Sequence, residues 1–205
     1  MAVRLGENFQ REWDEEPFPG ELWDAQKLLK ENLASGRAML TDLAGRGSTL
    51  AKMYLGHSLV KSGESSEVAL GEIWLIRSAK DGSVEGRFQL FVHYKRQQQG
   101  DKAVAELEAL ADAGYAPAMY ALGLTLYRGK LVNQDIPEAV KYLNMAKGAG
   151  HLPAMGLMAW IYRKEDFGLS GRIAAHWNCL AKIPSLAWYL FQYPNSDRLR
   201  GMRLP

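Results

Sequence analysis

The sequence predicts an all-α fold, a right-handed α-α superhelix built as a solenoid of antiparallel helix pairs. Glycine recurs at positions 47, 82, 114 and 150, which are 32 to 36 residues apart. Each interval carries two stretches with apolar residues at helical spacing, and that period is typical of helix-pair repeats. The 205 residues are 47% hydrophobic and 23% charged, as in a globular protein and unlike a disordered chain.

The clearest repeat spans residues 115–150. Its first predicted helix ends at Gly129, a natural C-terminal stop, and its second begins after Asp135, a good N-cap residue. Pro137 fits the first turn of that second helix, and Gly150 ends it. We expect each of the recurring glycines to leave its helix through a left-handed conformation, which other residues adopt at a higher free-energy cost.

Small side chains recur at helical spacing within this repeat. They are Ala118, Gly123, Ala139 and Ala146. They let neighbouring helices approach closely, while Tyr142 and Leu143 fill the space between layers. One such unit cannot bury its apolar face alone, so the units are expected to stack.

This repeat resembles the Sel-one-like repeat, a relative of the tetratricopeptide repeat. The residues that match the family pattern in register are Ala118, Leu122, Gly123, Gly129, Val132, Asp135, Ala139, Tyr142, Ala146 and Gly150. Leu126 replaces the family's aromatic residue and Leu131 its second glycine. The resemblance covers about residues 36–184, and it implies a scaffold for protein–protein binding, as in adaptors, assembly factors and bacterial regulators of secretion or envelope processes.

The other repeats match more loosely, and in the second one Phe91 replaces the helix-packing glycine. We expect an N-terminal extension at 1–19 and one solenoid at 20–193, followed by a basic tail at 194–205. The expected units are 20–47 (degenerate), 48–82, 83–114, 115–150 and 151–184, with a capping helix at 185–193. That aromatic capping stretch is alternatively a contact with another chain, although a monomer is favoured.

Composition argues against several classes of function. The net charge of +2 is too small for nucleic-acid binding, and no apolar run is long enough to cross a membrane. The only cysteine, Cys179, forms no internal disulfide, and no residues match a metal, cofactor or catalytic motif. The acidic run Asp14–Glu16 is interpreted as a solvated face. We expect no cofactor and a cytoplasmic location, or a periplasmic one if a signal peptide has been removed.

The first helix of each pair is expected to line a concave groove. The predicted partner-binding residues are Lys52, Tyr54, Arg87, Gln89, His93, Met119, Met155 and Trp160. His57 and His93 hold nearly equivalent positions, either on a shared wall of the groove or as solvated helix positions. The predicted surface is basic in its first half and apolar in its second, which favours a partner with an acidic segment beside an apolar anchor.

These residues leave four functions open. The first is an adaptor that binds another protein, such as a secretion or envelope component, and the second is a bacterial immunity protein that neutralises a secreted toxin. The third is an enzyme or ligand sensor, which needs a pocket with convergent polar groups that the sequence does not indicate. The fourth is a structural oligomer that associates through its ends.

Overall fold

The structure is a computed structural model that describes residues 7–164 and 173. Within those residues it contains helices and no strand, so the predicted all-α class is confirmed. The chain divides into two compact units, one at Asn8–Glu106 and one that begins at Leu107. Cys179, the predicted capping helix at 185–193 and the tail at 194–205 lie outside the described residues.

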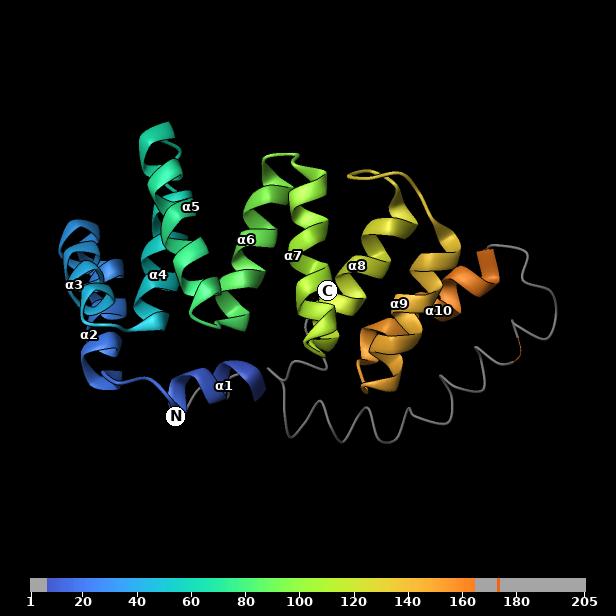
Figure 1. The fold of residues 1–205 in the computed structure, drawn as a ribbon, viewed down its shortest axis with the longest axis horizontal. Helices are drawn as coiled ribbons and strands as arrows, with labels where there is room; N and C mark the ends of the chain where they lie inside the picture. The colour runs from blue at the N-terminus through green and yellow to red at the C-terminus, as the bar shows by residue number, and fades with distance from the viewer. Residues whose placement is uncertain (1–6, 165–172, 174–205) are drawn as a thin grey trace. The chain divides into compact units, whose positions relative to one another are not determined.

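Within each unit, the successive helices of the repeats pack as antiparallel neighbours (Figure 1). The first unit begins with a short helix, α1 (Glu7–Asp14), inside the segment expected as an N-terminal extension. The helices that follow are α2 (Pro19–Glu31), α3 (Leu33–Gly45), α4 (Thr49–Val60), α5 (Ser65–Lys80), α6 (Val84–Arg96) and α7 (Gly100–Asp112). From Leu107 on, the second unit contains α8 (Ala116–Arg128), α9 (Ile136–Gly148) and α10 (Leu152–Lys164). Helices α2, α4 and α6 are called first helices below.

Turn chemistry explains where these helices begin and end. All four recurring glycines have positive φ, between 80° and 107°, as their spacing predicted. Ser48 caps α4 by accepting a hydrogen bond from the backbone N–H of Ala51 at 2.9 Å. Asp135 caps α9 in the same way, through the N–H of Glu138 at 2.9 Å. These caps satisfy amide groups that the first turn of a helix leaves without intrahelical partners.

Glycines also set the closeness of the helix pairs. A Cβ atom on Gly123 in α8 would lie 2.7 Å from Leu143 Cγ and 3.0 Å from the carbonyl oxygen of Ala139, both in α9. Real Cβ atoms do not approach other heavy atoms that closely, so only glycine fits at this crossing. The predicted role of small residues in helix packing is therefore confirmed.

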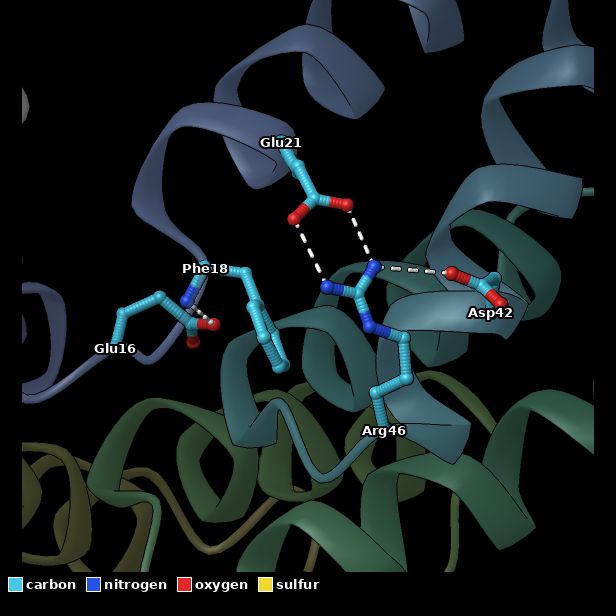
Figure 2. A network of polar contacts seen from close by, with 5 residues as sticks. All are labelled: Glu16, Phe18, Glu21, Asp42 and Arg46. Carbon is cyan, nitrogen blue, oxygen red and sulfur yellow. Dashed lines mark hydrogen bonds and ion pairs between the residues drawn. The ribbon is translucent and has the colours of Figure 1, made fainter.

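A charged cluster joins α2 to the end of α3 (Figure 2). The guanidinium of Arg46 binds both carboxylate oxygens of Glu21, at 2.6 and 2.9 Å, and also contacts Asp42 at 3.2 Å. The same guanidinium lies 4.0 Å from the centre of the Phe18 ring. These groups are exposed, so the bidentate geometry orients the first helix pair more than it stabilises it.

The core of the second unit is apolar. Its buried cluster is formed by Ala111, Met119, Tyr127, Ala139, Leu143, Ala146, Ala154, Met158 and Ile161. Alanines at the crossings and large side chains between them follow the pattern that the sequence predicted for this repeat. Each of α8, α9 and α10 thereby buries one stripe against its neighbours.

Candidate functional site

Polar side chains from three successive first helices meet in the Asn8–Glu106 unit. We call this surface the first-helix face. Its residues are Gln26 of α2, Tyr54 and His57 of α4, and Glu85 and Gln89 of α6. Because equivalent helices of successive repeats stand next to each other, one position on each helix contributes to a continuous surface.

One end of the face is centred on Tyr54. Burial raises the pKa of Tyr54 to about 12, although hydrogen-bond donation from Trp13 and Gln26 opposes the rise. Both donor atoms, Trp13 Nε1 and Gln26 Nε2, are buried, and within the described residues neither makes a well-aligned hydrogen bond. Tyr54 is therefore protonated at neutral pH in a closely packed but imperfectly satisfied polar environment.

The other end is a chain of three hydrogen-bonded side chains. The Gln89 amide donates to Glu85 Oε1 at 2.7 Å, and its carbonyl oxygen lies 2.9 Å from His57 Nδ1. Burial, followed by the charge of Lys61, lowers the pKa of His57. The imidazole is thus neutral near pH 7, with the proton on Nδ1 and an acceptor lone pair on Nε2. Glu85 is only 8% exposed, so this end presents Gln89 and the His57 ring, with the buried Glu85 carboxylate behind them.

Helix α1 lies against the same face. Figure 1 shows α1 beneath the lower ends of α4, α5 and α6. The Glu12 carboxylate accepts hydrogen bonds from the Ser83 hydroxyl at 2.6 Å and from the backbone N–H of Glu85 at 3.1 Å. Trp13 packs edge-on against Trp23 of α2, with ring centres 6.4 Å apart. Helix α1 therefore contacts all three first helices.

The two cations of the predicted basic half of the groove already form ion pairs within the unit. Lys52 forms an ion pair with Asp81, and Arg87 forms one with Glu106 at 3.0 Å. Lys52 and Tyr54 are two residues apart on one helix, which places their side chains about 200° apart around its axis. The structure brings Tyr54 and Gln89 to the first-helix face and places Lys52 and Arg87 elsewhere.

His93 is only 4% exposed, so it is not the solvated position that the sequence suggested. Its Nε2 lies 3.4 Å from Glu72 Oε2, and the Tyr94 hydroxyl donates to Glu72 Oε1 at 3.0 Å. Burial raises the pKa of Tyr94, and Glu72 adds to the rise. These contacts join α6 to α5 inside the unit, out of reach of a partner on the folded surface.

The predicted apolar half of the groove lies in the second unit, and most of it is buried. Met119 and Met155 are 7% and 6% exposed, and Met119 belongs to the core cluster. Trp160 is 40% exposed, with its ring 5.4 Å from that of Tyr127 and Lys164 Nζ 5.0 Å from its centre. Of the three, Trp160 is the residue that a partner can contact.

The acidic run Asp14–Glu16 is not uniformly solvated. Glu16 is 7% exposed and accepts a hydrogen bond from the backbone N–H of Phe18 at 3.2 Å (Figure 2). This contact forms the bend between α1 and α2. Beside it, an open pocket of about 140 Å³ is lined by residues of α1, the start of α4 and the turn before α6.

Sequence reasoning missed Glu12, Trp13, Gln26 and Glu85. A signal existed for Glu85, because it precedes Gln89 by one helical turn and therefore shares its face. Nothing local points to Glu12 or Trp13, since their partners are 10 to 73 residues away along the chain.

In the described part of the chain, no three His, Cys, Asp or Glu side chains are grouped so that they could hold a metal ion. Over the same residues, no helix has the length and apolar character needed to cross a bilayer.

Stacked antiparallel helix pairs with a polar face on their first helices define a helical-repeat protein. No protein-family model matches the sequence, and no curated protein matches it. Solved structures match the fold. A Sel1 repeat protein from Oxalobacter formigenes superposes with a TM-score of 0.60 at 20% identity, over 79% of this chain and 51% of that one.

Two further structures share the architecture. The protective antigen c5321 of uropathogenic Escherichia coli, which has an SLR fold, gives a TM-score of 0.58 at 18% identity, over 94% of this chain and 50% of its own. MamA AMB-1 gives 0.50 at 19% identity, over 78% and 95%. The chain spans about half the length of the first two. The fold is thus that of Sel1-like repeat proteins, as the resemblance predicted.

Proposed function

We propose that this protein is a non-enzymatic interaction scaffold that binds a partner protein on the first-helix face. The observation that carries the proposal is the Glu85–Gln89–His57 chain. It fixes three polar side chains on two first helices, α4 and α6. A face that is ordered before binding loses little conformational entropy when a partner arrives. The shared Sel1-like fold supports a scaffold, since repeat solenoids present extended surfaces for binding.

The chemistry of the face defines the partner segment. Neutral His57 supplies an acceptor at Nε2, and the buried Glu85 carboxylate holds the Gln89 amide in place. The part of the segment that contacts His57 and Gln89 should therefore present N–H or O–H donors. This differs from the acidic segment expected from Lys52 and Arg87, because those two cations already have acidic partners inside the unit.

A photo-crosslinking amino acid at position 89 tests the proposal in cells of the source organism. The full chain with the crosslinker at Gln89 should capture a discrete partner, and the same group at exposed Ala69 on α5 should not. Adding His57→Ala should reduce capture from position 89 at least fivefold. Equal capture from both positions, or none from position 89, would contradict the proposal.

The narrower role of an immunity protein that neutralises a secreted toxin stays a prediction. It requires that co-expression of this chain rescues cells from a toxin encoded beside its gene. Rescue that is lost in the His57→Ala, Gln89→Ala double variant would join that role to the first-helix face. Rescue that survives the double variant would assign it to another surface.

A further inference from the structure

We propose that α1 is an intramolecular strap that covers the first-helix face beside Tyr54, through Trp13, and at the start of α6, through Glu12. A partner segment that displaces it would carry the same two groups, a carboxylate beside an aromatic side chain. The inference rests on the proposed function, because it concerns access to the same face.

Two of the described side chains of α1, Glu12 and Trp13, make its inward contacts. Glu12 contacts the first turn of α6 through the Ser83 hydroxyl and the Glu85 N–H. Trp13 lies between Trp23 of α2 and Tyr54 of α4. Both side chains block the path that a partner segment would follow along the face from Gln89 towards Gln26.

The remaining described side chains of α1 face outward. Gln10, Arg11 and Asp14 are exposed, and Gln10 Nε2 donates to Asp14 Oδ1 at 2.9 Å within the helix. Eight residues are too few for a helix that is stable alone in water. Among the described side chains, Glu12 and Trp13 hold it to the unit, and loss of both should release it.

The docking of α1 on the first helices leaves polar groups incompletely satisfied, as expected for a contact that can be displaced. Burial raises the pKa of Glu12, so the carboxylate loses more from desolvation than its two hydrogen bonds return, and the nearby Glu85 carboxylate adds repulsion. Trp13 Nε1 is buried without a well-aligned acceptor among the described residues. Both features weaken the closed arrangement.

Geometry makes the strap an effective competitor. Four residues, 15–18, separate α1 from α2. A segment tethered by so short a connection acts at an effective concentration of the order of millimolar. A free segment with the same two contacts should therefore bind the intact protein weakly and bind a strap-released variant much more tightly.

A peptide of residues 7–18, carrying a fluorescent label, tests the inference on the full chain. It should bind the Glu12→Ala, Trp13→Ala variant at least tenfold more tightly than the unaltered protein. The matched control Asp14→Ala removes an exposed carboxylate from the same helix and should bind as the unaltered protein does. Equal affinity for unaltered and double-variant proteins, or equal binding of a peptide with both alanines, would overturn the inference.

Hydrogen exchange gives a second readout if the peptide binds too weakly to measure. In the double variant, amides of residues 10–14 and the Glu85 amide should exchange at least tenfold faster, while those of α3 keep their rates. Unchanged exchange would overturn the strap.

Crosslinking separates this inference from the proposed function. Capture from position 89 should rise in the double variant. Faster exchange without higher capture would overturn the strap's effect on binding and leave the scaffold intact, whereas failure of all capture from position 89 would count against the scaffold.

Discussion

Gly56 and Gly71 face each other where α4 crosses α5. A Cβ atom on Gly56 would lie 2.9 Å from the carbonyl oxygen of Gly71, and one on Gly71 would lie 2.8 Å from that of Gly56. The backbones of α4 and α5 are therefore in direct van der Waals contact at this point. This close crossing fixes the position of α4 along α5, and with it the positions of Tyr54 and His57.

Replacing Gly56 with alanine should destabilise the protein by about 1–3 kcal/mol, since a backbone carbonyl cannot move away without shifting α5. The measurement is urea unfolding followed by circular dichroism. Gly156→Ala on α10 is the control, because a Cβ there meets nothing within 4 Å. It should be neutral or stabilising by up to about 1 kcal/mol. A harmless Gly56→Ala would mean that the crossing is looser than described.

Gln98 is the only residue other than glycine with positive φ in the described chain, at 57°. A left-handed conformation costs such a residue about 1–2 kcal/mol, partly offset by the larger unfolded-state entropy of glycine. Gln98→Gly should therefore stabilise the protein by about 0.5–1 kcal/mol in urea unfolding. The reverse change at the turn after α4, Gly63→Ala with φ 86°, should destabilise it. Two shifts of the same sign would refute this account.

Burial lowers the pKa of His57, so its contribution to stability has a defined sign. The unfolded chain binds the proton more readily, and the contribution present above the ordinary histidine pKa of about 6.5 is lost as pH falls through the lowered value. The difference in unfolding free energy between the unaltered protein and His57→Gln should therefore shrink below pH 6.5, by at most about 1.4 kcal/mol per pH unit. A constant difference from pH 7.5 to 5 would contradict it.

The pKa of Glu12 is raised, chiefly by burial, so docking of α1 should depend on pH in the opposite sense. A raised carboxyl pKa favours the docked helix below the ordinary value, and this advantage is lost as pH rises through the raised value. Exchange of the amides of residues 10–14, corrected for its intrinsic pH dependence, should be slower at pH 4.5 than at pH 7.5. Glu12→Gln should remove most of the difference, and an equal pH effect in that variant would exclude Glu12 as its source.

The candidate site could be predicted only in part. Tyr54 and Gln89 were found because successive repeats place equivalent positions side by side. Lys52, Arg87 and His93 did not join them on the face, since each has an acidic partner inside the unit. A repeat pattern gives the position of a residue on its helix, but pairing depends on which charged groups neighbouring helices bring near.

The sequence alone determined the helical class and the helix ends, because caps, left-handed glycines and apolar spacing act over a few residues and repeat along the chain. Only the tertiary structure decided that α1 returns to the first helices. That contact joins Glu12 to Ser83 and Glu85, 71 and 73 residues away, through burial and two hydrogen bonds that leave no periodic trace. Which polar residues of this protein face a partner is likewise a property of packing, since burial depends on neighbours that are distant in sequence.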